Sequence, residues 1–143
     1  MKPPFLPIAA LAFVLVACTQ KQNPEKEAVF AAIQAHLQAV EQENIDAVMA
    51  TLHPATPGLE QQRQENEAMF KKYDLKFEIV SMKLESLTDT EAKVASTQKA
   101  LRVGGEKDLP DLIYDSVWTL QKDGDKWKII NSVQLRITPL PPK

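Results

Sequence analysis

The sequence predicts an α+β fold in which N-terminal helices pack on one face of a curved antiparallel β-sheet. Apolar residues first recur at three- and four-residue steps, which is typical of amphipathic helices. From residue 75 onward they alternate, which is typical of half-buried strands. Helices followed by a run of strands joined by short turns indicate one domain with two layers.

Three helices are predicted in the first half of the chain. The first begins at Glu25 and has one apolar stripe, formed by Val29, Phe30, Ile33, His36, Leu37 and Val40. Asn44 can cap a second, short helix, which ends at His53 because a residue before proline is disfavoured in the α region. The third helix is expected over residues 59–73, after the Pro57-Gly58 loop.

The first two strands form the start of the predicted sheet. Alternation begins at Leu75 and changes parity near residues 79–81, which indicates a β-bulge. The second strand is expected over residues 91–103, which are rich in Ala, Val and Thr. Gly104-Gly105 is then expected to open a polar loop.

The last two strands are predicted to form a hairpin. The third strand covers residues 112–121, and Asp123-Gly124 suits the positive φ angles of a tight turn. The fourth strand is expected to alternate through Trp127, Ile129, Val133, Leu135 and Ile137. These elements predict a single domain over residues 25–138, followed by a flexible tail over residues 139–143.

The N-terminus has the pattern of an export signal. Lys2 precedes an uncharged, apolar run over residues 5–17. At about 1.5 Å per residue this run is too short to cross the roughly 30 Å hydrocarbon core of a membrane. A positive start, a short apolar run and small residues at its end indicate a secretory signal peptide over residues 1–17.

The end of this run, Leu15-Val16-Ala17-Cys18, resembles the lipobox of bacterial lipoproteins. The resemblance implies that lipid is joined to the Cys18 thiol, that a peptidase cuts before it and that the new amine is acylated. Cys18 is the only cysteine, so the chain has no internal disulfide. Residues 18–24 would then be a lipidated tether that holds the domain at the cell envelope, facing the periplasm. Thr19, in place of an aspartate, favours the outer membrane over the inner one. The alternative is an ordinary cysteine beside an ordinary signal peptide.

A second resemblance covers roughly residues 25–137. The order of elements and the stretch from Tyr114 to Ile129, with its Trp-Lys-Ile strand after the turn, are similar to the nuclear-transport-factor-two-like superfamily. Ketosteroid isomerase and the SnoaL-like polyketide cyclases belong to it. The resemblance implies a cone-like sheet with a pocket under the helices. The short strand that many members have between helix and sheet is not obvious here.

Four residues are candidates to line that pocket: His36, Tyr114, Trp118 and Asn131. His36 could act as a base, although a boundary histidine bonded to a backbone carbonyl is the more common arrangement. Tyr114 shares its parity with Trp118, so it should point to the apolar face, where its hydroxyl needs a partner. Asn131 interrupts an apolar series and must be hydrogen-bonded if it is buried. An irregular strand would instead turn it outward.

The sequence predicts no catalytic residue, no metal site and no cofactor. It has no nucleophile motif or phosphate-binding glycine loop, its two histidines have no metal-site spacing, and a formal net charge of −2 argues against nucleic acid. It therefore favours a non-catalytic module that binds a small apolar ligand or an envelope protein, with membrane lipid as a partner through Cys18. A homodimer through the sheet is also expected.

Two other functions stay open. One is an envelope enzyme of the ketosteroid isomerase or polyketide cyclase type. It requires an inward carboxylate near Tyr114, a role that Asp111 or Glu78 would have to fill. The other is a cystatin-like inhibitor, which shares a helix over an antiparallel sheet.

Overall fold

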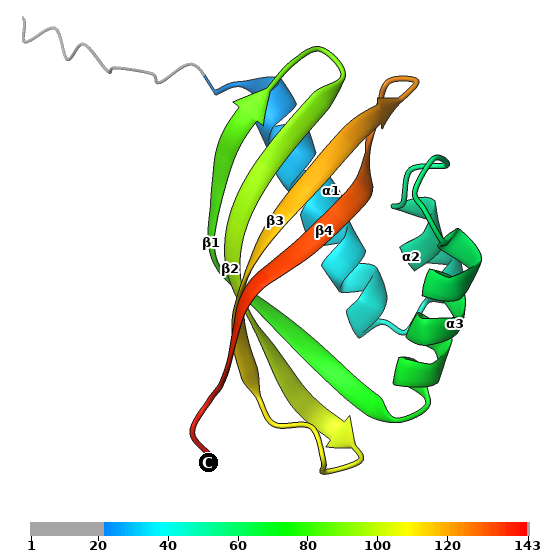
Figure 1. Cartoon of the computed structure of the whole chain (residues 1–143), viewed down its shortest axis with the longest axis vertical. Coiled ribbons are helices and arrows are strands. Elements are labelled where there is room, and N and C mark those ends of the chain that lie inside the picture. The colour runs from blue at the N-terminus through cyan, green and yellow to red at the C-terminus, as the bar shows by residue number, and fades with distance from the viewer. Residues whose placement is uncertain (1–21, 143) are drawn as a thin grey trace, which may run out of the picture.

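A computed structural model describes residues 22–142 and confirms the predicted fold class. Helices lie on one side of a four-stranded antiparallel sheet with the order β1-β2-β3-β4 (Figure 1). The predicted signal peptide, residues 1–17, and Cys18 lie outside the described residues. Within the described range, no helix is long and apolar enough to cross a membrane.

The first helix, α1 (Pro24–Glu41), begins one residue earlier than predicted. The Asn23 side chain accepts hydrogen bonds from the backbone N–H groups of Glu25 and Lys26, at 3.1 and 3.4 Å. Pro24 follows this cap, in the first turn, where its missing N–H costs nothing. Pro24, expected in the tether, therefore belongs to the helix.

The next two helices are short. Asn44 caps α2 (Ile45–Ala50) as predicted, because its side chain accepts the Ala47 N–H at 3.0 Å. The chain after α2 then touches the sheet, where His53 N–H donates to the Ile129 carbonyl at 2.8 Å. α3 (Leu59–Phe70) ends earlier than expected, because Tyr73 already pairs with Gly105 in the sheet.

The strands are β1 (Tyr73–Leu87), β2 (Glu91–Gly105), β3 (Leu112–Asp123) and β4 (Lys126–Pro139). The predicted bulge in β1 is confirmed by a register shift between Ile79 and Ser81. The expected loop at Gly104-Gly105 is wrong, because both glycines pair with β1. A Cβ on Gly105 would overlap the Lys72 carbonyl oxygen, so glycine permits this close approach.

The predicted alternation of β4 is wrong from Ile129 to Leu135, where a second register shift restores it, so that Ile137 lies opposite Tyr114. Leu120 pairs with Ile129 and Thr119 pairs with Asn131, so Ile130 is an extra residue that reverses the parity of the strand. Ser132 therefore lies opposite Trp118.

The predicted start of the flexible tail also needs correction. Thr138 and Pro139 still pair with β3. Leu140 N–H then donates to the Asp111 carbonyl at 2.8 Å, so the sheet extends past residue 138.

The main core fills the space between α1 and the sheet. Its buried side chains come from the helix stripe and from the inward face of the strands: Val29, Ile33, Leu37, Leu52, Ala92, Val94, Trp118, Leu120, Trp127 and Ile129. A smaller cluster of Ala39, Val40 and Val48 joins α1 to α2. Helix packing thus covers one half of the sheet, while β4 from Asn131 to Pro139 stays exposed.

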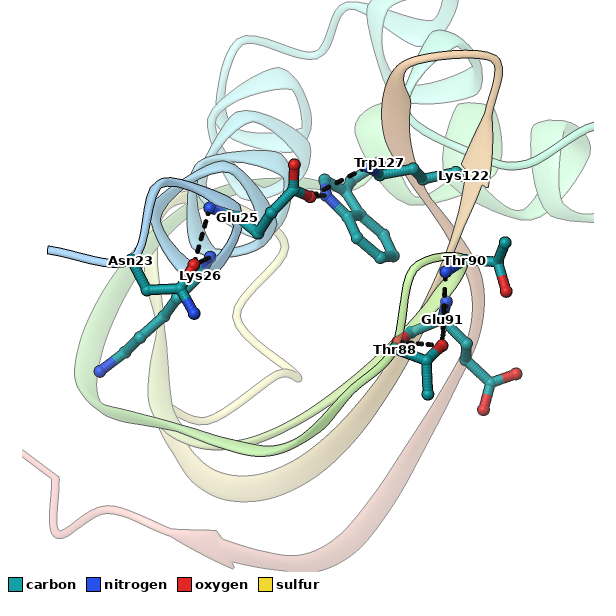
Figure 2. A network of polar contacts seen from close by, with 8 residues as sticks. All are labelled: Asn23, Glu25, Lys26, Thr88, Thr90, Glu91, Lys122 and Trp127. Carbon is teal, nitrogen blue, oxygen red and sulfur yellow. Dashed lines mark hydrogen bonds and ion pairs between the residues drawn. The ribbon is translucent and has the colours of Figure 1, made fainter.

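Polar contacts fix the start of α1 to the β3–β4 hairpin (Figure 2). The Glu25 carboxylate accepts a hydrogen bond from Trp127 Nε1 at 2.8 Å and lies 3.1 Å from Lys122 Nζ. The Lys122 ammonium also lies 5.1 Å from the centroid of the Trp127 ring. Nearby, the Thr88 hydroxyl accepts the backbone N–H groups of Thr90 and Glu91 in the β1–β2 turn.

Candidate functional site

A cavity of about 500 Å³ lies between the helices and the inward face of β3 and β4. Its apolar lining includes Leu37, Val40, Leu52, Met69, Phe77, Trp118 and Ile129. Polar side chains from α3 and β4 add Gln62, Glu65, Asn66, Ser132 and Gln134. The lining is mixed, with at least as much polar as apolar surface, a composition suited to small organic molecules that carry polar groups on an apolar body.

All four candidates from the sequence line this cavity: His36, Tyr114, Trp118 and Asn131. Trp118 is 5% exposed, and its Nε1 donates to the Ser96 hydroxyl at 2.8 Å. Asn131 is exposed and pairs with Thr119, so the bulge at Ile130 places it at the rim. The irregular strand therefore turns Asn131 away from the interior, which is one of the two outcomes expected for it.

His36 contacts two other elements from its place on α1. Its Nδ1 lies 2.7 Å from the Thr51 hydroxyl, just after α2, and its ring meets the Trp118 ring edge-on at 5.9 Å. Burial lowers the pKa of His36 to about 4, so the imidazole is neutral near pH 7. A neutral imidazole presents one N–H donor and one acceptor nitrogen.

Tyr114 projects inward from β3, as its parity predicts, and is 8% exposed. Burial raises the pKa of its hydroxyl to about 12, so it stays protonated. Among the described residues no group bonds this hydroxyl. It is therefore available to a molecule in the cavity.

Two polar side chains on the inward face of the sheet, Gln98 and Ser116, are buried without lining the cavity, and sequence reasoning did not identify them as a pair. Gln98 on β2 is fully buried and lies opposite Tyr114. Its amide, like the hydroxyl of buried Ser116, has no hydrogen-bond partner in the part of the chain that the structure describes. The signal for Gln98 was its parity, because Ala92, Val94 and Ser96 precede it on the same inward face.

The two acidic residues that an enzyme of the isomerase type would require make their contacts outside the cavity. Asp111 accepts the Arg102 backbone N–H at 2.8 Å, and Glu78 pairs with Lys99 at 3.5 Å. Neither lines the cavity. Glu65 does, but it is exposed on α3 and accepts a hydrogen bond from Gln61 at 2.8 Å. Sequence reasoning missed Glu65, because the polar sequence of α3 does not indicate which of its turns lies over a cavity.

No metal centre is evident between residues 22 and 142. Histidine and acidic side chains in this range do not gather in any group of three that could hold an ion.

Solved structures with the same fold come from several bacteria. A protein assigned as a scytalone dehydratase from Novosphingobium aromaticivorans superposes with a TM-score of 0.67 at 15% identity, over 84% of this chain and 90% of that one. One assigned as a dehydratase of the NTF2-like family from Streptomyces avermitilis gives 0.64 at 18% identity, over 84% and 100%. A ketosteroid isomerase-like protein from Erwinia carotovora atroseptica gives 0.62 at 20% identity, over 84% and 99%. The chain therefore has the nuclear-transport-factor-two-like fold.

Sequence comparison assigns the family. None of the curated proteins matches the chain. A family model described as the C-terminal domain of the anti-sigma-I factor RsgI9 matches residues 31–140, which include most of α1 and the whole sheet. The chain therefore belongs to the family of the RsgI9 C-terminal domain.

Proposed function

We propose that this protein is a lipid-anchored bacterial lipoprotein whose domain binds a small, largely apolar ligand and does not catalyse a reaction. The observation that carries the proposal is the cavity of about 500 Å³. Its interior combines apolar side chains with a neutral histidine and a protonated tyrosine. Within residues 22–142, no carboxylate bonds Tyr114. The family description supports binding as well, because it names an anti-sigma factor and not an enzyme.

The proposed anchor is acylated Cys18, with the domain facing the periplasm, and with the outer membrane preferred. Only residues 19–22 separate Cys18 from the Asn23 cap of α1. Five peptide units span at most about 18 Å. The domain would therefore stay close to the bilayer surface.

Metabolic labelling tests the anchor. Cells that express the native chain are fed a fatty-acid analogue and compared with cells that express Cys18→Ala. We expect label and membrane association in the native protein and neither in the variant. Equal labelling of both proteins would contradict the anchor.

Filling the cavity tests ligand binding. Ser132→Trp would project a large side chain from β4 into the cavity, whereas Val133→Trp, on the opposite face beside Val117, is the matched control. We expect the uncharged dye N-phenyl-1-naphthylamine to bind a fragment of residues 19–143 and its Val133→Trp variant but not Ser132→Trp. Equal binding to both variants would exclude this cavity.

A second candidate function is an enzyme of the ketosteroid isomerase or polyketide cyclase type. It is favoured by Glu65, His36 and Tyr114 lining one cavity. The test is ultraviolet detection of a conjugated enone formed from a β,γ-unsaturated ketosteroid. Turnover that is lost in Tyr114→Phe would support this function over simple binding.

The homodimer through the sheet stays a proposal too. Three large apolar side chains of the edge strand β4 are exposed: Val133, Leu135 and Ile137. Exposed apolar edges are sites of association. Sedimentation analysis should show a dimer that Leu135→Lys dissociates.

A further inference from the structure

The hydroxyl of Thr51 determines which nitrogen of His36 carries the proton. This hydroxyl lies 2.6 Å from the Val48 carbonyl oxygen and 2.7 Å from His36 Nδ1. A hydroxyl has one hydrogen, and a carbonyl oxygen can only accept. At 2.6 Å the two oxygens would repel each other unless the Thr51 hydrogen lay between them.

The consequence is a fixed tautomer for His36. Because the Thr51 hydrogen is donated to Val48, the contact with His36 requires Nδ1 to be the donor. A neutral ring with its proton on Nδ1 leaves Nε2 as a bare acceptor. No other residue in the described range bonds this ring. Unlike the Gln98 and Ser116 atoms, Nε2 is not sealed from solvent.

We infer that His36, held by Thr51, makes the cavity selective for uncharged, largely apolar ligands that carry an N–H or O–H donor. This inference rests on the proposed ligand binding. His36 lines the cavity, and once a bound molecule has displaced water from Nε2, this acceptor is satisfied only by a donor from the ligand. The apolar and aromatic walls, with Phe77, Tyr114 and Trp118, suit a flat hydrocarbon body. Thr51 is a positioning residue, because it acts through the imidazole.

The tautomer can be observed directly. The full chain, labelled with ¹⁵N-histidine and purified in detergent, should show His36 with a protonated Nδ1 and an unprotonated Nε2. Thr51→Val keeps the β-branched shape but removes the hydroxyl, so the proton should move to Nε2. Thr51→Ser should restore the original tautomer. A protonated Nε2 in the native chain would overturn the inference.

Ligand selectivity is tested with two probes of nearly equal size. Indole has an N–H donor, and indene has a CH₂ group in its place. Apparent dissociation constants come from titrations followed by the His36 signal. The ratio of the apparent dissociation constant for indene to that for indole is compared between variants in the same detergent, so that the partition of the probes into micelles cancels. We expect the ratio to fall about fivefold in Thr51→Val, the equivalent of one ordinary hydrogen bond, and to recover in Thr51→Ser.

Thr88→Val is the matched control. The Thr88 hydroxyl also donates to a backbone carbonyl, that of Glu91, but it neither lines the cavity nor bonds His36. Its removal should leave the tautomer and the probe ratio unchanged. An equal ratio in the native chain and Thr51→Val, with both probes bound, would overturn the selectivity and leave the proposed binding function intact. Binding of neither probe to the native chain would overturn both.

Discussion

Ser96 and Ser116 lie opposite each other on β2 and β3, yet they have different surroundings. The Ser96 hydroxyl accepts the Trp118 indole N–H, whereas the buried Ser116 hydroxyl has no partner among the described residues. Ser96→Ala should lower the free energy of unfolding by about 1–3 kcal/mol, because it leaves the indole N–H buried and unpaired. Ser116→Ala, the matched control, should be neutral or stabilising. Urea unfolding of both variants checks this, and equal losses would contradict it.

His36 should make stability depend on pH. Its pKa is about 4 when folded and 6.5 ordinarily, so the unfolded chain binds the proton more readily between these values. The free energy of unfolding should therefore be highest above pH 6.5 and fall as the pH drops towards 4, by on the order of 3 kcal/mol.

Urea titrations across that pH range measure this effect. His36→Gln should remove most of the decrease in the free energy of unfolding, since the neutral amide does not titrate. The same slope in His36→Gln and in the native protein would show that other groups cause the pH dependence.

For individual residues, the sequence predicted only part of the candidate site. Parity along β3 predicted that Tyr114 and Trp118 would face inward, and the structure agrees. The tautomer of His36 could not be predicted from the sequence, because Thr51 is fifteen positions away and its hydroxyl donates to the Val48 carbonyl. Such a relation depends on interatomic distances, which side-chain pattern does not contain.

Two glycines of the sheet, one in a turn and one at the end of β2, have a positive φ for different reasons. Gly124 in the β3–β4 turn has a φ of 64° with open space around it, whereas Gly105 has a φ of 83° and lies against the Lys72 backbone. Both positions strain an L-residue, but only Gly105 also excludes a Cβ. Gly105→Ala should therefore lower the melting temperature more than Gly124→Ala. Thermal unfolding followed by circular dichroism compares them, and a larger loss in Gly124→Ala would contradict this explanation.

Among the described elements, α3 should be the easiest to open. It has no fully buried side chain, and Gly58 at its start gives no side-chain cap. Helices held by few buried apolar contacts open at low free energy. Hydrogen exchange should be faster in α3 than in α1, and a bound ligand should slow it, because Gln62, Asn66 and Met69 line the cavity. Equal protection of the two helices would rule out α3 as the opening element.

At this scale the sequence was informative about helix starts and less so about strand ends. Asn44 caps α2 as predicted, since capping is a local interaction. β4 was harder, because the bulge at Ile130 is a property of its pairing with β3. One extra residue reversed the face of Val133, and a second register shift at Leu135 returned Ile137 to a position opposite Tyr114.

For the whole molecule, the two periodicities were enough to predict the fold. Steps of three and four followed by alternation leave few two-layer arrangements, and the structure has the predicted one. The cavity was harder to predict. Glu65 and Asn66 reach it only because α3 packs beside α2 and β1 at the edge of the cavity, and that placement has no signature within α3 itself.

The contact between Glu25 on α1 and the β3–β4 hairpin should weaken at low pH. The hydrogen bond from Trp127 and the neighbouring Lys122 hold the pKa of Glu25 below its ordinary 4.5. A carboxylate with a lowered pKa stabilises the fold above that value, and the contribution is lost as the pH falls below 4.5. Glu25→Gln should make the acid side of the stability profile shallower. Fluorescence-detected unfolding on both sides of 4.5 measures it, and an unchanged profile would contradict the role of this contact.

The contact between Glu25 and Trp127 also affects the order in which parts of the domain can fold during synthesis. Glu25 and Trp127 are 102 positions apart, so this contact cannot form until nearly the whole polypeptide has been made. Synthesis delivers the front of a chain first. Here the first turn of the leading helix is therefore among the last parts of the domain to gain its partner, after the β3–β4 hairpin exists.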